Sequence, residues 1–323
     1  MIKKGYLVIS LDFELLWGMK DKSNCEEYKE NVINARYAIP QIIEMFEKYN
    51  IHATWATVGL IMNKTKEELL QNIPPIVPKY KNKKYSTYEY FDGIGESEET
   101  DPYHYGEKIV LSIIKQNNQE VGTHTYSHYY CSELGADKES FESDISKARN
   151  LMSQKYGLTC KSIVFPRNQY TDDSIDVIKK LGILCYRGNP KKGYDSTKKG
   201  FFLLVQRVLR FIDSYIPIYG AITYPNVRVE KEVVNVAASR FFRPYSGKML
   251  LEYLKIKRIK GQMKHAAKQG EMFHLWWHPH NFGKKTNIMI NELEDILKYY
   301  TELNSRYSFE SVNMKEYAEI LKN

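Results

Sequence analysis

The sequence lacks several features that mark secreted or repetitive proteins. Its 323 residues include only four cysteines, which lie far apart and form no CxxC pair: Cys25, Cys131, Cys160 and Cys185. Without paired spacing, they indicate reduced thiols rather than a disulfide framework. The chain also contains no internal repeat and no low-complexity segment, so neither a solenoid nor a disordered chain is indicated.

Long apolar runs are absent as well. The first residues lead directly into an apolar stretch of about eight residues, which is shorter than a membrane span and has no signal-peptide cleavage site. We therefore expect a protein without a transmembrane segment that works in the cytoplasm. Peripheral contact with an anionic membrane stays open as an alternative.

The charge balance is positive. Lysine and arginine contribute 47 residues against 39 aspartates and glutamates, a formal net charge of +8. Such an excess favours anionic partners, among them phosphates, nucleic acids and acidic membrane surfaces. The basic residues are mostly scattered and no nucleic-acid motif accompanies them, so nucleic acid is not an expected partner. Hydrophobic residues make up 43% of the chain, enough for a substantial core.

Short apolar runs alternate with helical patterns along the chain. The expected strands are Tyr6–Phe13, Ile51–Val58, Glu120–Thr123, Lys161–Phe165, Ile183–Tyr186, Met272–Trp277 and Tyr307–Val312. Helical patterns lie between most of them, at Ala38–Tyr49, Ser140–Tyr156, Asp173–Leu181, Ser246–Lys268 and Ile288–Leu303. This alternation predicts an α/β fold with a parallel sheet covered by helices, either open or closed into a barrel.

Two intervals interrupt the alternation, near 62–104 and near 189–245. The first contains Pro74, Pro75 and Pro78, a lysine cluster and an acidic run, and the second is rich in aromatic residues, proline and arginine. Long insertions in α/β folds often lie over the site as lids or substrate walls. A peripheral decoration or a dimer surface is an equal alternative. We interpret residues 1–323 as a single catalytic domain with these two insertions.

The first expected strand ends in two carboxylates. Because side chains alternate along a strand, Ser10, Asp12 and Glu14 point to one face, while Leu11 and Phe13 point to the other. Parallel α/β folds place their sites at the carboxyl ends of the strands. Buried carboxylates there need compensation, which a metal ion would supply. The alternative is a solvated strand end.

Two histidines, His124 and His128, follow the third expected strand and are four residues apart. One helical turn would bring them onto the same face, where both imidazoles bind one metal. Together with Glu14 they offer one oxygen and two nitrogens and leave positions open for water and substrate. This is the pattern of a catalytic rather than a structural zinc site.

A late apolar strand ends at His278. His274, His278 and His280 share one strand parity, so alternation alone does not choose among them. Pro279 is expected to end the strand, which places His278 on a rigid rim and His280 on a looser loop, with His274 deeper inside.

Another strand end carries Arg167, which is able to orient a carboxylate, although a surface arginine beside a proline turn is nearly as good an interpretation. The candidate substrate contacts are Arg167, Asn168, Trp277, His280 and Asn281.

Taken together, the motifs resemble those of the polysaccharide deacetylases of carbohydrate esterase family 4, the NodB-homology group. The resemblance rests on Asp12-x-Glu14, His124-x-x-x-His128 and the late strand ending at His278, and extends over nearly the whole chain. It implies a distorted (β/α)7 barrel and one divalent metal ion, usually Zn²⁺. Asp-x-Glu replaces the commoner pair of adjacent aspartates, as in divergent branches of the family. The usual order of arginine before proline is reversed at Pro166-Arg167.

The resemblance also implies a role for each residue. Asp12 is expected to be the catalytic base and His278 the general acid. Glu14, His124 and His128 are expected to bind the metal.

The implied activity is metal-dependent hydrolysis of the N-acyl group, most simply N-acetyl, of an amino sugar. Because no export signal is evident, a nucleotide-linked or lipid-linked precursor in surface polysaccharide synthesis is favoured over a finished polymer. Two alternatives stay open: a metal amidohydrolase acting on a non-sugar amide or cyclic imide, and a catalytically inactive barrel that binds glycans. The sequence does not predict the oligomeric state.

Overall fold

A computed structural model describes residues 4–21, 25–193, 200–230 and 232–323. Its strands are β1 (Gly5–Phe13), β2 (Ala53–Thr57), β3 (Gln119–Thr123), β4 (Ser162–Ile163), β5 (Cys185–Tyr186), β6 (Tyr224–Pro225), β7 (Val234–Asn235), β8 (Arg240–Phe241), β9 (Glu271–Trp277) and β10 (Phe309–Val312). Its α-helices are α1 (Cys25–Lys48), α2 (Lys66–Gln71), α3 (Glu107–Ile114), α4 (Lys138–Tyr156), α5 (Asp172–Lys180), α6 (Gly200–Asp213), α7 (Met249–Gln269), α8 (Thr286–Arg306) and α9 (Met314–Lys322).

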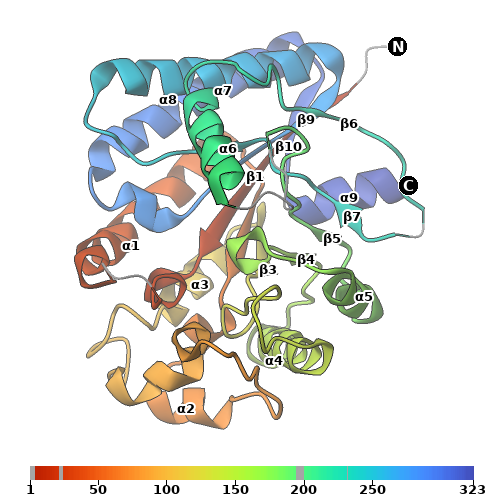
Figure 1. Cartoon of the computed structure of the whole chain (residues 1–323). Helices are drawn as coiled ribbons and strands as arrows, with labels where there is room; N and C mark the ends of the chain where they lie inside the picture. The colour runs from red at the N-terminus through yellow and green to blue at the C-terminus, as the bar shows by residue number, and fades with distance from the viewer. Residues whose placement is uncertain (1–3, 22–24, 194–199, 231) are drawn as a thin grey trace.

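Short 3₁₀ helices complete the connections: η1 (Leu15–Gly18), η2 (Gly59–Met62), η3 (Lys83–Tyr85), η4 (Thr87–Gly93), η5 (Pro166–Asn168) and η6 (Pro279–Phe282). Figure 1 shows the strands in the middle of the molecule, with α7 and α8 on one side and α4 and α5 on another. Within the described residues, no helix is both long and apolar enough to cross a membrane. Cys131, Cys160 and Cys185 are free thiols.

The sheet is parallel and curled, in the order β9-β1-β2-β3-β4-β5-β7. β10 pairs with the first half of β1, and β6 adds a short antiparallel pair to β9. The predicted α/β barrel-type fold is therefore confirmed. It brings the carboxyl ends of β1, β3, β5 and β9 to one edge of the sheet.

One part of this sheet lies inside an interval that the sequence suggested was an insertion. β7 pairs with β5, whereas β8, only a few residues later, pairs with β9. The segment 234–241 thus reaches from one edge of the curled sheet to the other. Each of its two strands is only two residues long, too short to produce a recognisable alternation of apolar and polar residues.

Strand β1 is the centre of the fold, and all nine of its residues are buried. Leu7, Ile9, Leu11 and Phe13 face the large core beneath the helices, whereas Tyr6 and Val8 belong to a second cluster on the opposite face. Ser10 and Asp12 share the parity of this second face. The polar side chains of β1 therefore point to the inside of the curled sheet.

Trp277 belongs to the large core and not to a substrate site. Its fully buried ring packs against Phe46, Phe242 and Phe282. The prediction that Trp277 contacts substrate is therefore wrong, because strand alternation turns it toward the helices. The preceding residue, Trp276, takes the opposite side and stacks against an arginine at the inner face.

We expect Trp277→Ala to lower the free energy of unfolding by about 3–5 kcal/mol, because it leaves a large cavity among closely packed rings. Urea unfolding followed by circular dichroism measures the change. Tyr37→Ala serves as the control, since this side chain is 70% exposed and its loss should cost at most about 0.5 kcal/mol. Equal losses in the two variants would contradict the placement of Trp277.

Candidate functional site

The two predicted carboxylates lie at the carboxyl end of β1 and are both buried. Asp12 is the penultimate residue of the strand, and Glu14 caps the 3₁₀ helix η1 that follows it. A buried carboxylate is stable only where positive charge or donated hydrogen bonds compensate it. The neighbours of these two groups therefore define the site.

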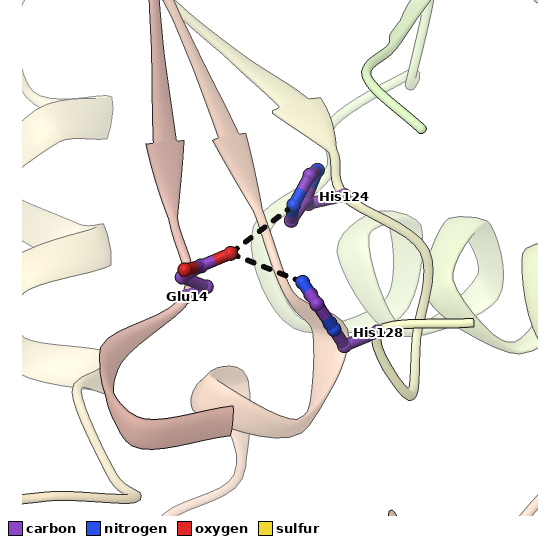
Figure 2. A group of neighbouring side chains, drawn as sticks. All are labelled: Glu14, His124 and His128. Atoms are coloured by element: carbon purple, nitrogen blue, oxygen red, sulfur yellow. Dashed lines mark hydrogen bonds and ion pairs between the residues drawn. The ribbon is translucent and has the colours of Figure 1, made fainter. Parts of the chain in front are cut away.

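Glu14 faces both histidines of the second motif. Its Oε2 atom lies 3.0 Å from His128 Nε2 and 3.4 Å from His124 Nε2, and Figure 2 shows the carboxylate pointing between the two rings. One ligand atom from each residue lies within 4.8 Å of the others. One oxygen and two nitrogens that converge from three sides fit a divalent ion.

Hydrogen bonding fixes the orientation of the first histidine. His124 Nδ1 lies 2.8 Å from the carbonyl oxygen of Val164, so that Nδ1 carries the proton and Nε2 faces Glu14. His128 Nδ1 is buried and has no hydrogen-bond partner among the described residues. Burial, opposed by Glu14, lowers the pKa of His128 to about 4, which keeps this imidazole neutral and able to bind a metal.

The histidine pair is not built on a helical turn, and that expectation is wrong. Residues after β3 form a loop in which Thr125 (φ 64°) and His128 (φ 57°) adopt the left-handed conformation. Asp144 of α4 stabilises this loop by accepting hydrogen bonds from the backbone of Tyr126 at 2.6 Å and of Ser127 at 3.1 Å. A strained loop held in this way is typical of functional sites.

The interval 62–104 supports the same loop from the outside. The Tyr80 hydroxyl accepts a hydrogen bond from the backbone N–H of Tyr130 at 2.8 Å. Thr87 donates its hydroxyl to the carbonyl of Ser127 at 2.5 Å. Residues of the interval 62–104 therefore pack beside the histidine loop.

Asp12 is paired with Arg187, a residue that the sequence motifs did not identify. The guanidinium donates to both carboxylate oxygens, from Nη1 to Oδ1 at 2.6 Å and from Nη2 to Oδ2 at 2.7 Å. It also donates to Asn168 Oδ1 at 3.1 Å and lies 4.1 Å from the ring of Trp276. Burial disfavours the charged carboxylate, but Arg187 and His278 outweigh it and lower the pKa of Asp12.

Arg187 could have been identified as a candidate site residue from its position in the sequence. It follows β5 directly, so it is a polar residue at a strand end like Asp12 and His124. Arg167, which was expected to orient a carboxylate, instead forms ion pairs with Asp21 and Glu133 and lies over the ring of Tyr130. Asn168 contacts the site through Arg187.

His274 and His278 of the last motif lie at different depths in the curled sheet. His278 lies at the rim, with Nε2 3.6 Å from Asp12 Oδ2 and 3.7 Å from Glu14 Oε1. His274 lies deeper, between the Ser10 hydroxyl at 2.8 Å and the Val236 carbonyl at 2.9 Å. Burial and Arg187 lower its pKa to about 3.

His280 is not on a loose loop. It lies in η6, is more buried than His278, and its ring stacks on that of His278 with centroids 4.9 Å apart. The proline at the start of η6 tightens the chain, which explains the difference from the expectation. Burial, with the neighbouring His278, lowers the pKa of His280 to about 4. Asn281 donates its backbone N–H to the His278 carbonyl at 2.9 Å.

Three kinds of group that are useful in hydrolysis lie together in this site. A carboxylate, Asp12, is held ionised and oriented. A set of three ligands fits a divalent ion. A partly exposed imidazole, His278, lies within 3.7 Å of both carboxylates. Such a site is suited to hydrolysis assisted by a base, an acid and a metal.

Comparison with known proteins agrees with the fold described above. The family model for polysaccharide deacetylases matches residues 33–186. A protein assigned as a polysaccharide deacetylase from Mycobacterium smegmatis aligns over 99% of this chain and 91% of its own, with 12% identity and a TM-score of 0.62. Another, from Pseudomonas aeruginosa, aligns over 98% and 89%, with 9% identity and a TM-score of 0.55. No curated protein sequence matches.

These structural likenesses establish the NodB-type barrel as the fold. The matched sequence interval contains His124 and His128, whereas Asp12, Glu14 and His278 lie outside it and are brought to the histidines by the fold.

We expect the purified protein to bind about one divalent ion per chain, as three converging ligands would. His124→Ala and His128→Ala should each lose the metal while keeping the fold, as measured by elemental analysis and circular dichroism. His265→Ala, a half-exposed histidine on α7, is the matched control and should keep its metal. Full occupancy in both site variants would show that the ligand set is wrong.

Proposed function

We propose that this chain, which carries the matched segment, the motifs and the barrel of the polysaccharide deacetylases, removes the N-acyl group, most simply N-acetyl, from an amino sugar. The observation that supports this most directly is the distance from His278 to Asp12 and Glu14, 3.6 and 3.7 Å. An acid and a base therefore flank the place where three ligands converge. A protein that only binds glycans needs no such combination.

Zn²⁺ is the ion we propose for this site. Held by Glu14, His124 and His128, it would supply a Lewis acid that lowers the pKa of water and polarises the amide carbonyl. Two imidazoles with one carboxylate are a donor set found in catalytic zinc sites.

Asp12 accepts the proton of the attacking water. Arg187 occupies one lone pair on each carboxylate oxygen and leaves the others free, so the base is oriented and still able to accept. Because its pKa is lowered, Asp12 is ionised at neutral pH and ready to act.

His278 donates the proton that the leaving nitrogen requires, since an amine leaves poorly unless it is protonated. Its side chain is 23% exposed and lies at the rim, where a substrate arrives. His280 is unsuited to this role because its pKa of about 4 keeps it neutral. Stacked on His278, it positions the acid instead.

The proposal is tested by measuring acetate released from N-acetylated amino sugars by the metal-loaded protein. A cyclic imide and a simple non-sugar amide are the comparison substrates, since they would reveal a metal amidohydrolase of another specificity. Release from the non-sugar compounds alone would overturn the sugar assignment. Absence of turnover on all of them, with metal bound, would favour a glycan-binding barrel.

We expect Asp12→Asn to retain its metal but to lose turnover by about 10²–10⁴-fold, because it removes a base and not a ligand. Asparagine keeps one oxygen that accepts from Arg187. Initial rates and metal content are measured together, with Asp176→Asn on exposed α5 as the control. Loss of metal in Asp12→Asn would make Asp12 a ligand and reverse the assignment.

The two stacked histidines should respond differently to substitution. We expect His278→Gln to reduce kcat by about 10²-fold or more and to flatten the alkaline limb of the pH–rate profile, because the proton donor is gone. His280→Gln should mainly raise KM and leave that limb in place. Steady-state kinetics from about pH 5 to about pH 8, the range over which an imidazole titrates, separate the two variants. The reverse pattern would transfer the acid role to His280.

A further inference from the structure

Helix α6 exposes the apolar side chains that a helix of a globular protein normally buries. Phe201 is 73% exposed and Leu204 is 57% exposed. The complete exposed set is Phe201, Phe202, Leu204, Val205, Val208, Phe211 and Ile212. Six of these, all but Phe202, follow helical spacing along one side, which we call the α6 face. Figure 1 shows α6 in front of the sheet. A continuous apolar surface of this kind marks an interaction site.

The other side of α6 faces the protein and carries the half-buried Arg210 and the buried Asp213, while the exposed Arg207 lies at its border. These three residues line a cavity of about 260 Å³ between α6 and the sheet. The helix is therefore amphipathic, but its orientation is the reverse of the usual one: charged groups face the protein and an apolar stripe faces outward. An apolar partner over the α6 face and an anion in the cavity would both stabilise this orientation.

The cavity carries an excess of positive charge. Among the described residues that line it, the cations are Lys192, Arg207, Arg210, Arg240 and Arg243, and the one carboxylate is Asp213. That carboxylate is already bonded to Arg240 at 2.6 Å and to Arg258 of α7 at 3.1 Å. Lys192, Arg207 and Arg243 have no carboxylate partner among the described residues, and such cations suit a phosphate or diphosphate group, whose oxygens accept their hydrogen bonds.

The pKa values of two arginines in the cavity are consistent with a phosphate site there. Burial and the neighbouring Arg258 and Arg243 lower the pKa of Arg240 to about 10, even though Asp213 opposes the shift. Burial and Arg210 lower the pKa of Arg243 in the same direction. Burial is the main cause of both shifts, so a bound polyanion would compensate cations that are partly removed from water.

The cavity adjoins the catalytic site through shared residues. Asn168 and Trp276 line it, and both also contact Arg187, the partner of Asp12. Phe241 lines it as well, and its ring centroid lies 5.9 Å from that of His278. A phosphate held in the cavity would thus lie beside the group that the base and acid act upon.

We propose that the α6 face docks on the surface of a phospholipid bilayer and that the cavity behind it binds the phosphate of a lipid-linked N-acylated amino sugar. The identity of the sugar rests on the proposed function, whereas the bilayer and phosphate contacts rest on α6 and the cavity. A lipid-linked substrate accounts for both features, because its tail stays in the bilayer and its phosphate reaches the arginines. A soluble phosphosugar would account for the cavity alone.

Charge favours a bilayer over a second copy of the chain as the cover for α6. Arg207 is exposed and lies one helical turn from Leu204 and from Phe211, so a cation borders the apolar face. Two copies meeting through this face would bring their cations together, whereas anionic headgroups neutralise them. The net charge of +8 acts in the same direction.

The first test measures sedimentation of the metal-loaded protein with vesicles of phosphatidylcholine containing phosphatidylglycerol. We expect binding that weakens at high salt and that falls by about tenfold or more in the triple variant Phe201→Ser, Leu204→Ser, Val208→Ser, which removes three exposed apolar groups. Circular dichroism verifies that the variant is folded.

The matched control removes three exposed leucines elsewhere: Leu70→Ser, Leu111→Ser and Leu134→Ser. It should bind vesicles like the wild type. Failure of the wild type to bind vesicles, or equal loss in the two triple variants, would overturn the bilayer assignment. A stable dimer that the α6 variant dissociates, without vesicle binding, would assign the face to a second copy.

The second test measures pyrophosphate binding by calorimetry with no vesicles present. We expect Lys192→Gln combined with Arg207→Gln to weaken it by about tenfold or more, since two charge-assisted contacts are lost. Lys115→Gln combined with Lys161→Gln is the control and should bind like the wild type. Absent or unchanged binding would overturn the phosphate site. Neither test uses turnover, so a failure here is distinct from a failure to release acetate.

Discussion

The structure depends on compensating two carboxylates that are buried at the end of one strand. Asp12 and Glu14 are both almost inaccessible to water, so each must obtain positive charge from the protein or from a bound ion. Arg187 supplies it to Asp12, whereas Glu14 faces the imidazoles of His124 and His128, and these three groups fit a divalent ion that would supply the charge. The left-handed histidine loop and the Asp144 carboxylate beneath it keep those groups in place. The two carboxylates are therefore compensated differently, by a salt bridge at Asp12 and by a set of groups that fits a metal ion at Glu14.

The expected strand ends in the sequence indicated which polar side chains would lie close together. Alternation along β1 separated Asp12 and Glu14 from Leu11 and Phe13, and the rule that parallel strands end at one edge brought His124 and His278 toward them. This worked because β1, β3 and β9 are long enough to carry a clear pattern. The roles proposed for these residues rest on chemistry that only experiment tests.

Other parts were not predicted from the sequence, for physical reasons. His128 reaches Glu14 through a left-handed residue, and spacing alone does not distinguish such a loop from a helical turn. Arg187 follows a strand of two residues, so its position at a strand end was inconspicuous. Trp277 was assigned to the wrong face because aromatic residues suit cores and sugar sites equally well. Burial decides between these, and burial is a property of the whole fold.

The position of β1 has a consequence for how the protein matures during synthesis. Two of the strands that pair with β1 come from residues 271–277 and 309–312, far behind it in the chain. Until those residues leave the ribosome, β1 presents unpaired backbone on one side and its carboxylates lack the shelter of the completed barrel. An unpaired apolar strand readily pairs with other chains. A nascent chain stalled before residue 271 is therefore exposed to aggregation through its N-terminal strand.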